Sequence, residues 1–288
     1  MRRQRLLTAV LLAALISLPA AAHAESRVAL VIGNSAYRHT PRLINPINDA
    51  KDITGALSRL GFDVSEAIDL DKRTLDDALR AFANRSAAAD TALVFYAGHG
   101  LQVSGQNYLL PVDAKLESER DLDFETIRLD VILRQLETGR DGKTSLVFLD
   151  ACRDNPLARN LARAMGVRSI ERGLAPVQSG AGVFIAYSTQ PGNTARDGTG
   201  RNSPFAGALL RHIAAPDRNV SALMIEVRKD VMAATSGRQV PWDHSALTGE
   251  FHFNQWTGIV TGSVPGPAPG SLHEERVRRL DEELGRRP

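Results

Sequence analysis

Short apolar runs alternate with amphipathic helical patterns along most of the chain. Residues 27–33 form a continuous apolar run that ends in glycine, which is typical of a strand buried on both faces of a sheet. A helical pattern follows up to Leu60, with Asn45 and Pro46 as its start and Gly61 as its stop. The alternation predicts an α/β fold in which helices cover both faces of a mainly parallel sheet.

The same reading assigns the other elements. Further strands are predicted at residues 62–68, 92–97, 145–149 and 182–187, and a short hairpin at 103–110. Helices are predicted at residues 74–82, 127–136, 204–213 and 222–234, the third of them capped by Ser203. Residues 257–271 are rich in Gly and Pro and predict a linker. Residues 272–288 predict a charged helical tail, for which a solvated helix is favoured over a partner-binding coiled coil.

The first 24 residues have the pattern of a secretory signal. Three arginines precede an apolar run at residues 6–18, and Ala22 and Ala24 form a small-x-small cleavage site. The run is shorter than the ~20 residues of a membrane-spanning helix, although an uncleaved anchor is the alternative. We therefore expect an exported bacterial protein, periplasmic or secreted, with no stable membrane insertion after the signal is cleaved.

Removal of that signal changes the charge of the chain. The full sequence has 35 basic and 33 acidic residues, and the signal contains three arginines and no acid, so the mature chain has a formal charge of −1. A near-neutral chain gives no electrostatic support for nucleic-acid binding.

Two predicted strands are each followed by a reactive side chain. His99, flanked by glycines, follows residues 92–97, and Cys152, the single cysteine, follows residues 145–149. Ligands of open α/β sheets bind beyond the carboxyl ends of the strands, so the two side chains share one crevice if the strands are neighbours. The flanking glycines predict an uncovered imidazole that a substrate backbone can approach. The alternatives are a small buried cysteine and a surface histidine. The other histidines lack such a setting: His39, His212, His244, His252 and His273.

A cysteine and histidine pair is suited to nucleophilic catalysis. An ordinary thiol, with a pKa of about 8.5, is only ~3% ionised at pH 7, and a nearby imidazole removes that limit. The imidazolium can then protonate a leaving amine. The backbone N–H groups of Gly100 and Cys152 are the expected oxyanion donors.

Three short motifs surround these residues. YAGHG occupies residues 96–100, DACR residues 150–153 and YSTQPG residues 187–192. They resemble the histidine motif, the nucleophile motif and the substrate-flanking strand of the caspase and metacaspase-like cysteine peptidases. That family places the histidine about 50 residues before the cysteine, and the separation here is 53.

The resemblance implies a three-layer caspase-hemoglobinase fold with a mainly parallel sheet of about six strands. It covers residues 27–253, most of the mature chain. The implied peptidase domain spans residues 25–256, with a large-subunit-like part at about 25–172 and a small-subunit-like part at about 180–254. The implied activity is that of a cysteine endopeptidase acting on a peptide or protein, and Ser188 is an expected substrate-binding residue.

Three acidic residues differ from the caspase pattern, and they affect which substrate residue is expected before the cleaved bond. Asp150 stands where caspases have glutamine, and Asp197 stands at the spacing of a caspase arginine that binds the substrate. Asp49 lies in a segment resembling a metacaspase stretch that supplies another acid to this S1 pocket. Three carboxylates imply cleavage after Arg, or less often Lys. The alternatives are a helix-dipole role for Asp49 and a solvated loop around Asp197.

Residues 153–181 are predicted to form an arginine-bearing loop. It is either a solvated loop or a site of self-cleavage, with Arg159, Arg163, Arg168 and Arg172 as candidate sites.

Rival functions are a catalytically silent caspase-like interaction or signalling module of the cell envelope, and an Asn-specific peptidase of the legumain type. No nucleotide-binding or zinc motif occurs, so no metal or cofactor is expected to be required. Many metacaspases respond to calcium, and the sequence leaves that dependence and the oligomeric state open.

Overall fold

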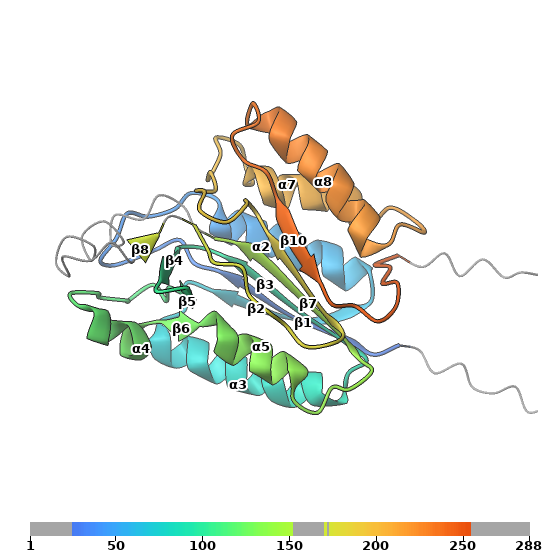
Figure 1. Cartoon of the computed structure of the whole chain (residues 1–288), viewed down its shortest axis with the longest axis horizontal. Coiled ribbons are helices and arrows are strands. Elements are labelled where there is room, and N and C mark those ends of the chain that lie inside the picture. The colour runs from blue at the N-terminus through green and yellow to red at the C-terminus, as the bar shows by residue number, and fades with distance from the viewer. Residues whose placement is uncertain (1–24, 152–169, 172, 255–288) are drawn as a thin grey trace, which may run out of the picture. The chain divides into compact units, whose positions relative to one another are not determined.

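The computed structural model describes residues 25–151, 170–171 and 173–254, which contain a six-stranded sheet (Figure 1). Its strand order is β10-β9-β7-β3-β1-β2. Neighbouring strands are parallel except for β10, which pairs antiparallel with β9 at one edge. The strands are β1 (Arg27–Gly33), β2 (Phe62–Ile68), β3 (Thr91–Ala97), β7 (Thr144–Asp150), β9 (Val183–Tyr187) and β10 (Trp242–Ser245).

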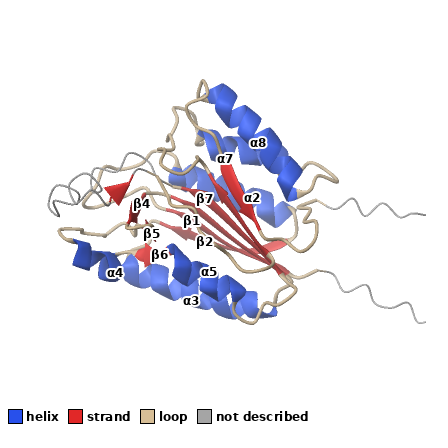
Figure 2. Ribbon diagram, in the orientation of Figure 1, coloured by secondary structure: helices blue, strands red, loops and turns tan. Residues whose placement is uncertain are grey.

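Helices cover both faces of this sheet (Figures 1 and 2). Side chains of a strand alternate between the two faces; accordingly, Phe95 and Phe148 pack in one apolar core and Val94 and Val147 in the other. Because each face needs an apolar cover, the inner strands contain uninterrupted apolar runs, such as residues 92–97 of β3 and 146–149 of β7. One face is covered by α2 (Pro46–Arg59), α7 (Pro204–His212) and α8 (Val220–Ala234), and the other by α3 (Lys72–Ala88) and α5 (Leu129–Glu137).

A second sheet begins just beyond the carboxyl end of β3. Its four strands have the order β6-β5-β4-β8, and all its pairs are antiparallel. A third apolar cluster, which includes Tyr37, Leu101 and Tyr108, packs around it. Its elements are β4 (Gly100–Val103), β5 (Gln106–Leu109), β6 (Ile127–Arg128) and β8 (Ile170–Glu171), with a 3-10 helix (Glu119–Asp121) and α4 (Leu122–Glu125) before β6.

The predicted fold class is confirmed, and several element boundaries differ from prediction. The hairpin begins at Gly100 rather than at residue 103. The helix predicted at residues 127–136 begins only at Leu129, because residues 127–128 pair with β5 instead. The helix predicted at residues 74–82 extends over Lys72–Ala88, since Asp71 caps it by accepting a hydrogen bond from the backbone N–H of Thr74. Strand β10 was not predicted because its residues lack apolar alternation.

Several predictions concern segments outside the described residues. These are the signal at residues 1–24, Cys152, the candidate self-cleavage sites Arg159, Arg163, Arg168 and Arg172, the linker at residues 257–271 and the tail at residues 272–288. The chain divides after Gln255 into two units, and the second unit is also outside them. Among the helices of the described part, none has the length and apolarity to cross a bilayer.

Candidate active site

The strands that precede His99 and Cys152 are neighbours in the sheet. β3 and β7 pair in parallel, and the last residues in register are Ala97 and Asp150. His99 and Cys152 therefore each follow this last pair by two residues of chain. The N–H of Gly98 donates to the carbonyl of Asp150 at 3.2 Å, which extends the contact between the two segments. The condition that the two strands are neighbours is therefore met, and Ala151 is the last described residue before the cysteine.

Two tyrosine hydroxyls hold the main chain of His99. The hydroxyl of Tyr37 accepts the backbone N–H of His99, and the hydroxyl of Tyr96 donates to the backbone carbonyl of His99, both at 2.7 Å. The two hydroxyl oxygens lie 3.4 Å apart, and both tyrosines are buried. Hydrogen bonds on both sides of one peptide segment fix its position within a buried network.

The imidazole ring of His99 is also positioned. Its centroid lies 4.5 Å from that of the Tyr37 ring, at an interplanar angle of 54°. The Nε2 atom lies 2.9 Å from the carbonyl oxygen of Pro41. A carbonyl can only accept a hydrogen bond, so Nε2 carries the hydrogen, and Nδ1 is the basic nitrogen of the neutral ring.

The two glycines beside His99 make room for protein groups. A Cβ atom on Gly98 would lie 2.6 Å from the Tyr37 hydroxyl and 2.7 Å from the Tyr96 hydroxyl. A Cβ atom on Gly100 would lie 3.2 Å from the Cβ of Ala151, so Gly100 packs directly beside the nucleophile segment. His99 itself is only 1% exposed. The prediction that these glycines leave the imidazole uncovered is therefore wrong, because the neighbouring tyrosines and Ala151 occupy that space.

Two of the predicted S1 acids lie at the same carboxyl edge of the sheet. Asp49 is in the first turn of α2, Asp150 ends β7, and both are fully buried. The backbone N–H of Ser203 donates to Oδ1 of Asp49 at 3.0 Å, and the hydroxyl of Ser203 donates to Oδ2 of Asp150. Both carboxylates thus contact one residue, although they come from different elements.

Asp197 has different surroundings. Its carboxylate accepts the backbone N–H of Ile44 at 2.7 Å, and its carbonyl accepts the side-chain amide of Asn45. Asn45 is the N-cap residue of α2, as predicted, but its side chain makes no capping hydrogen bond to the helix. Asp197 fastens the loop before α7 to the segment before α2.

Ser188 lies beside the nucleophile segment, as a continuation of β9. Its backbone N–H donates to the carbonyl of Leu149 at 2.9 Å, and its buried hydroxyl lies 3.5 Å from the carbonyl oxygen of Ala151. The motif that resembles the substrate-flanking strand of caspases therefore begins next to the segment that leads to Cys152.

Three contributors to this site were missed from the sequence. Tyr37 and Pro41 follow β1 at the carboxyl edge of the sheet, so the rule that ligands bind at strand ends could have drawn attention to that loop. Ser203 was identified as a helix cap, but its contacts with the acids span 53 and 154 residues of sequence. No local pattern predicts such contacts.

Two of the remaining histidines pair with acids, and one apolar hollow lies elsewhere. His212 contacts Asp230 at 2.9 Å and His252 contacts Glu250 at 3.3 Å.

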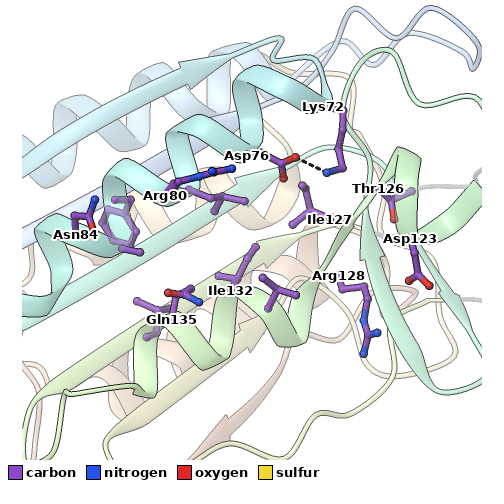
Figure 3. A pocket seen from close by; sticks show the side chains of 15 residues that line it. Lys72, Asp76, Arg80, Asn84, Asp123, Thr126, Ile127, Arg128, Ile132 and Gln135 are labelled. Atoms are coloured by element: carbon purple, nitrogen blue, oxygen red, sulfur yellow. Dashed lines mark hydrogen bonds and ion pairs between the residues drawn. The ribbon is translucent and has the colours of Figure 1, made fainter.

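A hollow of about 370 Å³ lies between α3 and α5, with Ile127 and Ile132 in its lining and the ion pair of Lys72 and Asp76 beside it (Figure 3). None of the residues that line the hollow belongs to the site around His99.

The fold and site define a three-layer α/β protein whose candidate site lies at the carboxyl ends of neighbouring parallel strands. The caspase domain model matches residues 26–252. The chain therefore belongs to the caspase domain family of cysteine peptidases.

Individual relatives agree with this family. Human mucosa-associated lymphoid tissue lymphoma translocation protein 1 is 33% identical over 45% of the chain, and its mouse homologue is 26% identical over 78%. The matched regions are 15% and 26% of the lengths of these relatives. The crystal structure of caspase-1 from Spodoptera frugiperda superposes with a TM-score of 0.59 at 20% identity, covering 82% of this chain and 93% of that one. This structural match supports the fold.

Proposed function

We propose that the chain is a cysteine endopeptidase in which Cys152 is the nucleophile and His99 the acid and base, and that it cleaves after Arg or Lys. The register of β3 and β7 supports the pairing, because each reactive residue follows the last matched pair by the same two residues. The contact of Gly100 with Ala151 also supports it, since it joins the histidine loop to the nucleophile segment.

The proposed reaction has two steps. The Cys152 thiolate attacks the substrate carbonyl carbon, the C–N bond breaks, and His99 gives a proton to the leaving amine. Water then attacks the acyl-enzyme, and His99 takes a proton from it as the C–S bond breaks. Since Nε2 of His99 is bonded to Pro41, Nδ1 is the nitrogen assigned to these transfers. The N–H groups of Gly100 and Cys152 are the proposed oxyanion donors.

The burial of Asp49 and Asp150 at the same edge is the observation that carries the proposed specificity. Carboxylates at this edge suit a basic P1 side chain, because a guanidinium or ammonium forms charge-assisted hydrogen bonds with them. Ser188 is proposed to line the same pocket. For Asp197 the contacts with Ile44 and Asn45 favour a role in holding the loop, so the specificity is assigned to the other two acids.

A fluorogenic series that differs only in the residue before the cleaved bond tests this proposal. Mature protein, with and without calcium, is expected to prefer Arg, then Lys, and Cys152→Ala is expected to be inactive. Preference for Asp over Arg would overturn the specificity. Failure of an Arg-directed covalent inhibitor to label Cys152 would favour a catalytically silent module instead.

Self-cleavage and export complete the proposal. Arg159, Arg163, Arg168 and Arg172 closely follow the proposed nucleophile in the sequence, which makes cleavage there by the enzyme itself chemically consistent. Intact masses of wild type and Cys152→Ala are expected to differ by such cuts, and cuts that persist in the variant would contradict self-cleavage.

Export predicts that N-terminal sequencing of the mature protein begins at Glu25.

A further inference from the structure

Ser203 uses its hydroxyl in two hydrogen bonds at once. It is the N-cap of α7, and its Oγ atom accepts the backbone N–H of Ala206 at 2.9 Å. The same Oγ donates its hydrogen to Oδ2 of Asp150. A hydroxyl has one hydrogen and two lone pairs, so both bonds form together. The residue is 1% exposed, and both bonds are shielded from water.

The backbone of Ser203 holds the second acid. Its N–H donates to Oδ1 of Asp49 at 3.0 Å. Asp49 and Asp150 belong to α2 and β7, and neither element by itself fixes the distance between the two carboxylates. Because Ser203 donates to both carboxylates, its position constrains their separation.

The loop that delivers Ser203 is fastened along one face of α2. Asn48 donates to the carbonyl of Arg201 at 3.1 Å, and Arg201 binds both carboxylate oxygens of Asp52 at 2.8 and 2.9 Å. Asn202 also donates to Asp52, at 2.9 Å. Asp52 follows Asn48 by four residues and Asp49 by three, so it neighbours both on the helix surface. These contacts keep Ser203 from moving away from the acids.

We propose that Ser203 is a positioning residue for substrate specificity, which holds the side chains of Asp49 and Asp150 in place to receive a P1 guanidinium. The inference rests on the proposed S1 role of these acids. A fixed pair of carboxylates suits the planar fork of arginine more than the compact ammonium of lysine. Ser203 thus acts on the preference for Arg over Lys as well as on the strength of binding.

The test compares Ser203→Ala, Ser203→Gly and Ser203→Thr with wild type on matched P1-Arg and P1-Lys substrates. Glycine keeps most of the capping effect and the backbone N–H but lacks the hydroxyl, whereas threonine keeps the hydroxyl. For Ala and Gly we expect KM for the Arg substrate to rise about 10- to 100-fold, with a smaller change in kcat and a lower ratio of Arg to Lys cleavage. Threonine is expected to retain values close to wild type. Alkylation of Cys152 by iodoacetamide, which does not use the S1 pocket, is expected to be unchanged.

Asn219→Ala is the matched control for loss of a helix cap. Asn219 caps α8 through the N–H of Ala222 at 2.9 Å and touches neither acid. It is expected to lower the melting temperature as Ser203→Ala does while leaving KM unchanged. The proposal is overturned if Ala and Gly keep the wild-type KM and Arg preference, if Thr behaves as Ala does, or if Asn219→Ala shifts KM equally. Lack of a basic preference in wild type would instead refute the underlying S1 assignment.

Discussion

The two ends of the six-stranded sheet both bury charge, with opposite signs. At the amino end, Arg140 is only 3% exposed. Its guanidinium donates to the backbone carbonyls of Ser86, Ala89 (2.9 Å) and Thr144 (2.7 Å). It also donates to the hydroxyl of Ser145 at 3.0 Å. At the carboxyl end Asp49 and Asp150 are fully buried, and Ser203 donates to both.

The buried charge of Arg140 has a structural role, whereas the role proposed for Asp49 and Asp150 is substrate binding. Arg140 directs its donors to oxygens of the protein, so its charge ties the end of α3 to the start of β7. Burial lowers the pKa of its guanidinium, but the ordinary value is so high that it stays charged. In the proposed function, Asp49 and Asp150 instead receive the cation of the substrate side chain. The comparison predicts that changes at the amino end alter stability and changes at the carboxyl end alter catalysis.

The largest effect is expected at the amino end, from Arg140→Met. The carbonyls of Ser86, Ala89 and Thr144 would lose a buried donor, so we expect the free energy of unfolding to fall by about 3–5 kcal/mol. Urea denaturation measures this loss, and active-site titration is expected to show unchanged kcat per folded molecule. Arg134→Met, at an exposed arginine of α5, is the control and should cost below about 0.5 kcal/mol. Reduced kcat in the folded fraction would break the comparison.

The next largest effect is expected at the carboxyl end, from Asp150→Asn. Removal of a buried charge that pairs with substrate should cost about 2–4 kcal/mol of transition-state binding, or roughly 30- to 1,000-fold in kcat/KM for a P1-Arg substrate. The asparagine can still accept a hydrogen bond from Ser203, so stability should change by less than about 1 kcal/mol. Steady-state kinetics and urea denaturation together measure both quantities. An unaltered kcat/KM would remove Asp150 from the S1 pocket.

Tyr37→Phe should give an intermediate effect, because it keeps the ring beside the imidazole and removes the acceptor for the His99 N–H. We expect kcat to fall about 10-fold with unchanged KM, and stability to fall by about 1–2 kcal/mol. Tyr108→Phe is the matched control, since the Tyr108 hydroxyl makes no hydrogen bond within the described part of the chain. Equal kinetics for the two variants would contradict a positioning role for Tyr37.

The smallest effect is expected for Asp52→Asn. The hydrogen bond from Arg201 lowers the pKa of Asp52 below its ordinary value of 3.8. A lowered pKa stabilises the fold above that ordinary value, and the contribution is lost as the pH falls through the folded-state pKa. The melting temperature of the variant should therefore lie below that of wild type at pH 6, by an amount equivalent to less than about 1 kcal/mol, and the gap should close below pH 4. A gap independent of pH would refute this assignment.

The fold could be predicted from the sequence where its signals are local. The apolar runs that became β1, β3 and β7 are buried on both faces, and Ser203 and Gly61 mark helix boundaries where expected. Trp242–Ser245 could not be predicted as a strand, because its pairing with β9 depends on contacts about 55 residues away in sequence and not on its own pattern. For the same reason residues 127–128 were assigned to a helix.

Periodicity and spacing in the sequence determined which strands His99 and Cys152 follow, because these are properties of neighbouring residues, and the resemblance of the three motifs predicted the family. Only the tertiary structure decided how the site is held. The Tyr37 hydroxyl on His99, the carbonyl of Pro41 on Nε2 and Ser203 between Asp49 and Asp150 are contacts across tens of residues or more. Such contacts exist because folding buries polar groups that must then find partners, and the identity of those partners depends on which elements the sheet brings together.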